Sequence, residues 1–435
     1  MVENYENSEH NRMVLLLEAV RAGIPTRSLV GALPDLRQKL TDSIDTDLEG
    51  LAGGKQVKGR VIWGSYGQGK THFLKTVEKR ILEQGFAVSY FSLNRDLGLN
   101  NLFNLFPALS SHVLTRETNI PGLLNQLAGH RLSLPMLETL FELCSGISHP
   151  LPRLIFESFI KYDANEMILL YNALMGKKEN ITVAKQLVRS FQKFEYKKMP
   201  KFVQREHLIS FVEFFSLLVK SLGYKGWVIL IDELEIVGRM GRVSRLNSYK
   251  NLSWLMNLSG EHKLPIYTLV ASADALNADV FRGARKQDAI EMPILAQERF
   301  GDTTAKLLTK FFDLITGSQG MVLTPLKPKD YIVLLDKLLE IHQEAIPWKH
   351  ELPENMVQDT LKRIDPSTKP VRQILRMFIE TLDLYSTVGI IPGKFNDNLQ
   401  ELYDFDSELP HLPEEDSNNE TSGFRETPLK DMFDA

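Results

Sequence analysis

Residues 64–71 read Gly-Ser-Tyr-Gly-Gln-Gly-Lys-Thr, the stretch of this chain with the most specific chemistry. The spacing G-x-x-x-x-G-K-[ST] is typical of a loop whose backbone N–H groups cradle nucleotide phosphates. Lys70 is expected to reach the β- and γ-phosphates, and Thr71 to offer its hydroxyl to Mg²⁺. The residues expected to contact ATP are Gly64, Ser65, Tyr66, Gly67, Gln68, Gly69, Lys70, Thr71 and His72.

A second motif, Trp-Val-Ile-Leu-Ile-Asp-Glu-Leu-Glu at residues 227–235, places acids at the end of an apolar strand. Asp232 is expected to hold the Mg²⁺ shell, since that ion binds few protein carboxylates and keeps several waters. Glu233 is expected to act as the general base on the attacking water. For Glu235, a helix-start charge and a functional acid are equally open interpretations. Alone, these acids could form a solvated turn, but the phosphate loop upstream favours catalysis.

The elements that must position these groups follow from the hydrophobic pattern. Short apolar runs alternate with helical patterns, which predicts an α/β fold with a parallel five-stranded sheet. The phosphate loop follows the first strand and the acids follow the third, at the carboxyl edge where ligands bind in such sheets. The strands are expected at residues 57–64, 87–93, 228–233, 266–272 and 321–326.

Lys70 and Asp232 lie 162 positions apart, more than a minimal nucleotide-binding core needs. The stretch between the second and third strands has helical periodicity and no convincing strand, which predicts a helical insertion. Three helices are expected after the last strand, at 329–346, 354–363 and 370–386. The domains expected are an N-terminal helical segment (1–50), an ATPase core (51–326) with its insertion (100–222), a helical lid (327–388) and an acidic, disordered tail (389–435).

The bulk properties indicate an ordinary globular protein, with 43% hydrophobic residues, 24% charged residues and a net charge of −4. One cysteine, Cys144, excludes an intramolecular disulfide and a cysteine zinc cluster, and its apolar surroundings favour an inert core thiol. The polar N-terminus shows no signal peptide, and no apolar run approaches the ~20 residues of a membrane helix. A cytoplasmic protein without membrane contact is therefore expected.

Charge is unevenly distributed along the chain. From Asp397 onward the chain has twelve acidic and two basic residues, a net charge of −10, which leaves a net charge of +6 for the remainder. The tail is either a solvated segment or a short peptide that docks on a partner. Its apolar anchors would be Phe424, Leu429, Met432 and Phe433.

Residues 185–205 are basic and are interleaved with aromatic side chains, a composition that suits phosphate neutralisation and base stacking. A DNA contact and a solvated helix face with core aromatics both remain open here. The cations are Lys185, Arg189, Lys193, Lys197, Lys198, Lys201 and Arg205, against Glu195 alone. A second basic group, equally open to a phosphate role, is formed by Arg239, Arg242, Arg245 and Lys250.

The phosphate loop and acidic strand, with a polar strand end at Ser272 and a lid helix opening at Arg372, together resemble the AAA+ ATPases, in the order of the initiator branch. Three stretches more closely resemble the ATP-binding proteins of BREX bacteriophage-defence systems, the BrxC/BrxD family, and its shorter BrxD-type members in particular. These stretches are Leu-Leu-Glu-Ala-Val-Arg-Ala-Gly-Ile-Pro-Thr-Arg (16–27), Gly-Ser-Tyr-Gly-Gln-Gly-Lys-Thr-His-Phe-Leu (64–74) and Leu-Ile-Asp-Glu-Leu-Glu (230–235).

The resemblance covers about residues 11–388 and implies Mg²⁺-dependent ATP binding and hydrolysis, self-assembly and work alongside other defence proteins. Ser272 would orient the attacking water, with Asp274 as a weaker candidate. Arg372 would reach the γ-phosphate, with Arg376 as the alternative, although each could be a plain surface arginine. An arginine from a neighbouring subunit would complete the site, and the candidates are Arg282, Arg285 and Arg299.

Two functions follow from this resemblance. The first is an ATPase switch or motor that assembles on ATP binding, and the second is a nucleotide-gated adaptor that turns over little ATP and recruits effector proteins. A small-molecule kinase fits less well, because of the insertion and the lid. Initiator-type relatives carry a DNA-gripping winged helix after the lid, whereas an acidic tail follows it here. Without that domain, direct DNA binding would have to come from the insertion or its basic stretch, and the alternative is a regulatory role with DNA contacted through a partner.

Overall fold

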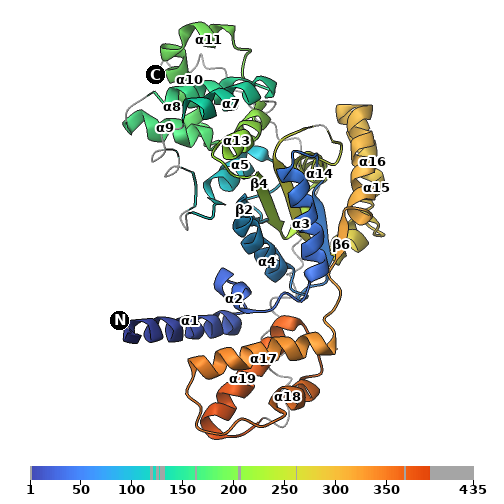
Figure 1. The fold of residues 1–435 in the computed structure, drawn as a ribbon. Coiled ribbons are helices and arrows are strands. Elements are labelled where there is room, and N and C mark those ends of the chain that lie inside the picture. The colour runs from blue at the N-terminus through green and yellow to red at the C-terminus, as the bar shows by residue number, and fades with distance from the viewer. Residues whose placement is uncertain are drawn as a thin grey trace, which may run out of the picture. The chain divides into compact units, whose positions relative to one another are not determined.

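The computed structural model describes residues 2–117, 121–123, 127, 133–161, 164–203, 207–260, 262–366 and 369–391. At its centre is a six-stranded sheet in the order β3-β2-β4-β5-β1-β6 (Figure 1). The strands are β1 (Arg60–Gly64), β2 (Ala87–Ser92), β3 (Val113–Leu114), β4 (Trp227–Asp232), β5 (Ile266–Ala273) and β6 (Gly320–Val322). Of the predicted tail (389–435), residues 392–435, with the apolar anchors, lie outside the described residues.

The sheet corrects the prediction of five parallel strands. Each of the five predicted segments contains a strand, and these five pair in parallel. A sixth strand, β3, pairs antiparallel with β2 and makes the sheet mixed. It lies inside the stretch for which no strand was expected. At two residues, β3 is too short to show the alternating pattern by which strands are recognised.

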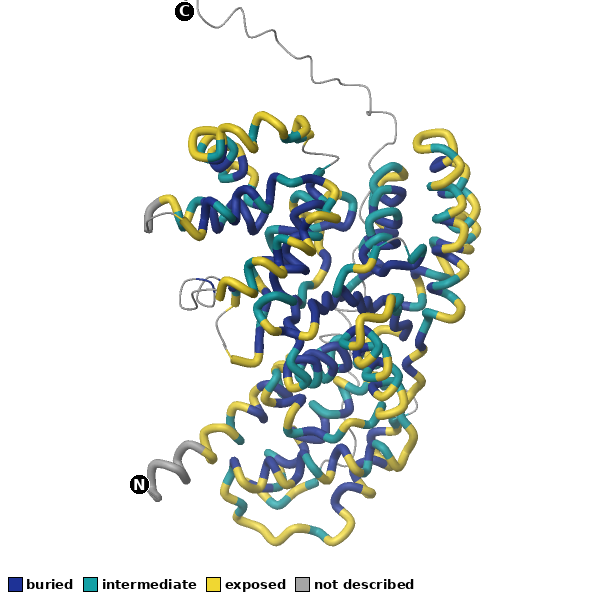
Figure 2. The backbone as a smooth tube through the Cα atoms, turned by 45° about the horizontal axis from the view of Figure 1, so that its top comes forward, coloured by how far each residue is buried: buried dark blue, intermediate teal, exposed yellow. Residues whose placement is uncertain are grey.

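Helices cover both faces of the sheet, which is why β1, β4 and β5 are buried along nearly their whole length (Figure 2). On one face α3 (Gln38–Ala52) and α4 (Lys70–Glu83) pack on β1, β2, β4 and β5 in one apolar core. A larger core on the other face includes α13 (Ile209–Ser221), α14 (Arg242–Leu255) and α16 (Asp302–Thr316). Side chains that alternate along each strand therefore face either α4 or α14, and this decides which of them can reach the phosphate loop.

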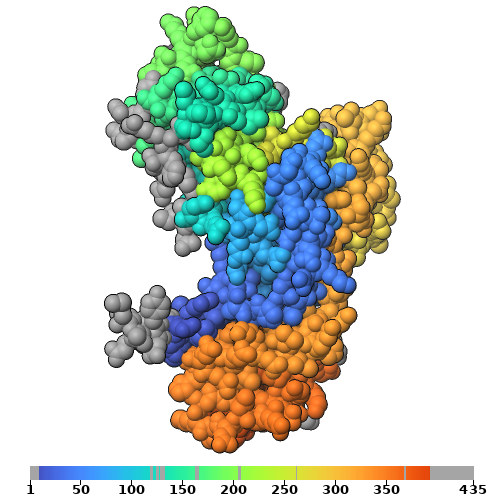
Figure 3. Space-filling model, in the orientation of Figure 1, coloured from blue at the N-terminus to red at the C-terminus, as the bar shows by residue number. Residues whose placement is uncertain are grey.

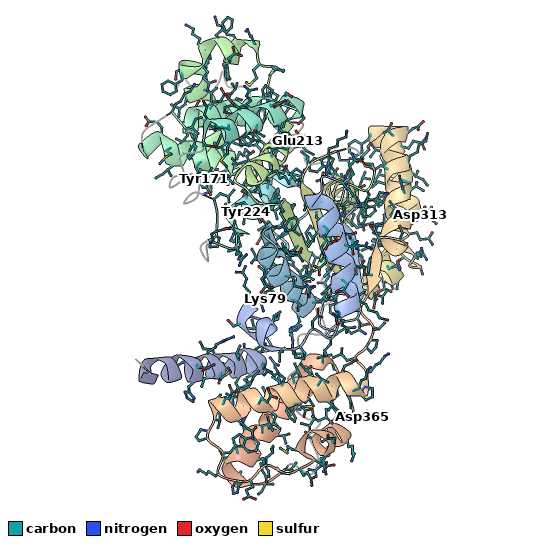
Figure 4. The ribbon with its side chains drawn as sticks, in the orientation of Figure 1. Lys79, Tyr171, Glu213, Tyr224, Asp313 and Asp365 are labelled. Carbon is teal, nitrogen blue, oxygen red and sulfur yellow. The ribbon has the colours of Figure 1, made fainter. Side chains whose placement is uncertain are left out.

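The helices between β3 and β4 share the larger core, in which Cys144 is buried. Burial raises the pKa of the Cys144 thiol to about 12, so it stays protonated. Tyr224, just before β4, donates its hydroxyl to Glu117 at 2.9 Å and so joins the two ends of this stretch (Tyr224 is labelled in Figure 4). The helices described in this stretch are α7 (Leu134–Leu143), α8 (Leu151–Phe159), α9 (Ala164–Leu174), α10 (Lys178–Phe191), α11 (Lys193–Lys198) and α13, and α5 (Leu102–Ser111) precedes β3.

The N-terminal helices and the C-terminal helices share a third core. Leu16, Leu17 and Val20 of α1 pack with Leu335 and Phe378. The helices are α1 (Val2–Ala22), α2 (Arg27–Ala32), α17 (Pro328–Ala345), α18 (Met356–Ile364) and α19 (Val371–Val388). The first helix is thus packed against the segment predicted as the lid, more than 300 residues later in the chain. Within the described ranges, no helix is long and apolar enough to cross a membrane.

Candidate nucleotide-binding site

The glycine-rich loop joins β1 to α4, and two of its glycines have backbone angles that favour glycine. Gly67 has φ +75° and Gly69 has φ +89°, both in the left-handed region. Across the loop, the Ser65 amide donates to the side-chain oxygen of Gln68 at 2.8 Å. The loop therefore has a defined turn that opens directly into the N-terminus of α4, where backbone N–H groups favour an anion.

Lys70 carries a buried positive charge. Its side chain is 7% exposed, and Nζ donates to the carbonyl oxygens of Gly64 (3.0 Å) and Ser65 (3.2 Å). The ammonium also lies 5.0 Å from the ring centre of Tyr66. The described hydrogen-bond partners of Lys70 are neutral, although its charge also interacts with the Glu233 carboxylate, and a buried cation held by neutral groups favours a bound anion. The loop therefore fits a phosphate group.

Asp232 is the matching buried anion. It is 2% exposed, and its Oδ2 accepts from the Thr71 hydroxyl at 2.7 Å and from the Tyr90 hydroxyl at 3.1 Å. Its Oδ1 accepts from the Glu233 amide at 3.0 Å. All three described donors are neutral. The Thr71 proton is committed to Asp232, which leaves the lone pairs of the Thr71 oxygen free for a cation. The residues thus fit Mg²⁺, a hard cation that prefers oxygen ligands.

Two further acids follow Asp232. Glu233 has φ +63°, an uncommon conformation for a residue with a side chain, at the start of the short 3₁₀ helix η2 (Leu234–Arg239). Burial, and then the carboxylates of Glu235 and Asp232, raise the pKa of Glu233 to about 7, although Lys70 opposes this. A carboxyl with such a pKa suits a general base at neutral pH. Glu235 is buried and accepts from the Ala273 amide at 2.9 Å, which ties η2 to the end of β5.

The end of β5 contacts the phosphate loop through Asp274. The Ser65 hydroxyl donates to Asp274 Oδ2 at 3.1 Å. Ser272 is fully buried, pairs in register with Trp63 of β1, and donates to the Ala273 carbonyl at 3.3 Å. Asp274 was the weaker of the two candidates from the sequence, yet it is the one whose side chain forms a hydrogen bond with the phosphate loop. The water-orienting role of Ser272 stays a prediction.

The start of α19 lies against the phosphate loop. A Cβ at Gly67 would lie 2.5 Å from Pro370 Cβ, the residue that caps α19. Arg372 follows in the first turn and is exposed, with its Cδ against Gly23. Arg376, half-buried, donates to the Ala22 carbonyl at 2.8 Å. Arg372 thus lies two residues after Pro370, which contacts the loop, while the side chains of Arg372 and Arg376 both pack at the end of α1.

His72 and Tyr66 complete the predicted loop residues. His72 lies in the first turn of α4, where burial lowers its pKa, although Asp35 opposes this. Tyr66 is exposed at the tip of the loop, with its ring beside the Lys70 ammonium. The three arginines proposed to act on a neighbouring subunit, Arg282, Arg285 and Arg299, are all exposed.

The second basic group is not one surface. Arg245 is buried and donates to both oxygens of the buried Asp288, at 2.8 and 3.0 Å, and Tyr249 donates to Asp288 at 2.7 Å. Lys250 lies over the ring of Phe300 at 4.3 Å, and burial lowers its pKa. The open alternative of a phosphate role is therefore wrong for Arg245, because its guanidinium already holds a carboxylate.

The first basic group is mostly exposed, on α10, on α11 and just after α11, and the atoms of these two helices are green in Figure 3. Phe191 is 46% exposed and Phe194 is 69% exposed beside these cations. Lys198 lies 3.8 Å from the ring centre of Phe194 and 3.7 Å from Glu195. The described cations are Lys185, Arg189, Lys193, Lys197, Lys198 and Lys201, whereas Arg205 lies outside the described residues. We call these six residues the basic surface.

The sequence of this chain matches the profile of one known family over most of its length. The sequence profile of the family "BREX system ATP-binding protein BrxC/D" matches residues 10–128 and 195–389. The chain belongs to this family. It is therefore an ATP-binding protein of a BREX defence system. The matched residues include the phosphate loop, Asp232 and Glu233, while helices α7 to α10 lie in the unmatched part between residues 128 and 195.

Solved structures add a weak similarity. The Walker-type ATPase PABY2304 of Pyrococcus abyssi is 13% identical and aligns over 80% of this chain and 67% of that chain, with a TM-score of 0.32. Curated proteins gave no match.

One residue at the site was missed from the sequence. Tyr90 lies on the second strand, outside both motifs, and its hydroxyl reaches the same Asp232 oxygen as Thr71 does. The position of Tyr90 on the strand could have indicated it. Val88 packs in the core beside α4, and Tyr90 shares its face because side chains two residues apart on a strand point the same way. A polar atom on that face, near the carboxyl edge of the sheet, was the only indication available.

Proposed function

We propose that this BREX protein is a Mg²⁺-dependent ATPase that acts as a nucleotide-driven switch. The observation that carries the proposal is the 2.7 Å hydrogen bond from Thr71 to Asp232, because it joins the phosphate loop to the acidic strand end. It brings the buried Lys70 cation and the buried Asp232 anion into one site, and the described hydrogen-bond partners of each are neutral. A metal–phosphate pair is the ligand that satisfies both charges.

The chain's own residues would divide the work. Lys70 and the N-terminus of α4 would hold the phosphates, and Thr71 and Asp232 would hold the metal with its waters. Glu233 would accept the proton of the attacking water on its carboxylate, for which a pKa raised to about 7 is suited. Bound Mg·ATP supplies the phosphoryl group and the metal charge that offsets negative charge on the reacting oxygens.

The lid and a neighbouring subunit would complete the site. Arg372 follows Pro370, which touches Gly67, so a small shift of α19 would carry this exposed arginine toward the phosphates. From a second copy, Arg282, Arg285 or Arg299 would reach the same site, because all three are exposed. An arginine supplied in this way accelerates related phosphoryl transfers by ~10³- to 10⁵-fold. We therefore expect ATP-dependent self-assembly.

The basic surface would contact DNA. This surface has six cations and one acid, and two exposed aromatic rings lie among them. Cations bind the phosphates of nucleic acid with release of counterions, and exposed rings can stack on bases. DNA binding at this surface is separate from nucleotide binding at the phosphate loop, and either can fail without the other.

Two variants test the enzyme against the adaptor that binds ATP with little turnover. Lys70→Ala should lose nucleotide binding, and Glu233→Gln should bind ATP normally and lose multiple-turnover phosphate release. Release should be measured with and without DNA. Turnover by Glu233→Gln equal to that of the wild type would refute Glu233 as the base. Tight ATP binding by the wild type without multiple turnovers in any condition would favour the adaptor.

A further inference from the structure

The Asp232 carboxylate has a partner that neither motif supplies. Tyr90 donates its hydroxyl to Asp232 Oδ2 from β2, the strand that pairs with β4, and Tyr90 itself stands in register with Leu230. We propose that Tyr90 is a positioning residue for the Mg²⁺ site, which fixes the Asp232 carboxylate in the orientation that the metal's waters need. This inference rests on the proposed function and names a residue that acts through Asp232.

Tyr90 is a permanent donor in this bond. A phenol keeps its proton at neutral pH and a carboxylate oxygen can only accept, so the Tyr90 hydroxyl is the donor. Asp232 Oδ2 therefore has two donors and Oδ1 has one, the Glu233 amide. A carboxylate held on both oxygens has little freedom to rotate. Without the Tyr90 hydroxyl, Oδ2 would depend on Thr71 alone, which must also serve the metal.

An ion cluster around the buried Glu78 holds the Tyr90 ring. The Lys75 ammonium lies 3.4 Å from the centre of that ring, and it donates to Glu78 Oε2 at 2.9 Å. Glu78 is buried, and its Oε1 accepts from Arg27 at 2.8 Å. One buried acid with two cations is a satisfied arrangement that fixes Lys75 over the ring. A cation on the ring face draws electron density from the phenol, which makes its hydroxyl a better donor.

The cluster reaches the segment that packs on the C-terminal helices. Arg27 is the first residue of α2, whose N-cap Thr26 accepts from the Leu29 amide at 3.2 Å. Leu29 lies in the core that α1 shares with α17 and α19. Lys79 of α4, labelled in Figure 4, adds a second contact, because its Nζ would lie 3.0 Å from a Cβ at Gly31 of α2. The residues that hold the Tyr90 ring thus belong to α2 and α4, not to the sheet.

The test is a Mg²⁺ titration of ATP turnover in Tyr90→Phe, which removes one oxygen and keeps the ring. Loss of an outer-shell partner typically weakens metal binding by 10- to 100-fold, so the Mg²⁺ concentration for half-maximal turnover should rise about 10-fold or more. Saturating Mg²⁺ should restore most of the turnover. Binding of ATP without Mg²⁺ should be unchanged, which a general loss of structure would not produce.

Tyr267→Phe is the matched control. Tyr267 is also a strand tyrosine that donates to a carboxylate, Asp47 Oδ2 at 2.9 Å, but it is fully buried and lies near the start of β5 rather than at the carboxyl edge. It should leave the Mg²⁺ dependence unchanged. Lys75→Met keeps the Tyr90 hydroxyl and removes the cation above the ring. We expect it to give a smaller rise, about 2- to 5-fold, since such contacts are worth about 0.5–1 kcal/mol.

The outcomes separate the two levels of inference. A wild type that binds no Mg·ATP overturns the proposed function, and this inference with it. A wild type that turns over ATP, with Tyr90→Phe showing the same Mg²⁺ dependence, overturns the role of Tyr90 alone. If Tyr90→Phe does not fold, Lys75→Met decides, and a Mg²⁺ dependence like that of the wild type then refutes the inference.

Discussion

Gly67→Ala should loosen the contact between the phosphate loop and α19. At φ +75° an alanine costs about 1–2 kcal/mol in backbone strain. Its Cβ would also lie 2.5 Å from Pro370 Cβ, closer than two carbon atoms can approach. Overpacking of this kind costs about 1–3 kcal/mol. Because Pro370 is the N-cap residue of α19, we expect the strain to be relieved by displacement of the first turn of that helix.

Gly85→Ala is the matched control, because Gly85 has φ +84° and a Cβ there would meet nothing within 4 Å. Both variants carry the backbone strain, and only Gly67→Ala carries the clash. The assay is hydrogen exchange, without nucleotide, at the amides of Gln373 and Ile374, which donate to the Pro370 carbonyl at 3.0 and 3.1 Å.

A local opening made easier by about 1–3 kcal/mol speeds exchange about 5- to 140-fold. Gly67→Ala should show this acceleration in the first turn of α19, and Gly85→Ala should not. Equal exchange at these amides in both variants would refute the contact between Pro370 and the loop, and with it the route by which Arg372 is placed near the phosphates.

Three further predictions concern other parts of the chain. Asp288→Ala leaves the buried Arg245 unpaired and should destabilise the fold by about 3–5 kcal/mol, against about 0–1 kcal/mol for the exposed Glu291→Ala, as measured by denaturant unfolding. Reversing the charges of Lys193, Lys197 and Lys198 should weaken DNA binding and flatten its salt dependence, and unchanged affinity would make this a solvated face. Burial raises the pKa of Asp383, but hydrogen bonds from His342 and Arg21 outweigh burial and lower this pKa below 3.8. Its contribution to stability is then complete above pH 3.8 and is lost as the pH falls through the lower folded pKa. Acid unfolding followed by circular dichroism should be less steep in Asp383→Asn.

Local patterns in the sequence predicted much of the site. The glycines, Lys70 and Thr71 act within a few residues of one another, so their spacing alone identifies the loop. The approach of Asp232 to Thr71, from 161 residues away, was also expected, because a parallel sheet brings the ends of its strands to one edge. The role of each residue in catalysis stays a prediction.

Contacts between distant segments that follow no repeated pattern could not be predicted. The antiparallel β3 is too short to show a period, and Tyr90 carries no motif. Arg245 reads as a surface cation until Asp288, 43 residues later, is seen to pair with it. The packing of α1 on the C-terminal helices is of the same kind, because an apolar helix face shows that a partner exists but not which one.

The most direct test of the account is a calorimetric titration of ATP into the wild type and Lys70→Ala, each with and without Mg²⁺. We predict binding by the wild type that Mg²⁺ strengthens, and none by a folded Lys70→Ala, because the buried ammonium at the phosphate loop is the charge that the phosphates meet. Equal ATP binding by the two proteins would contradict the assignment of the site.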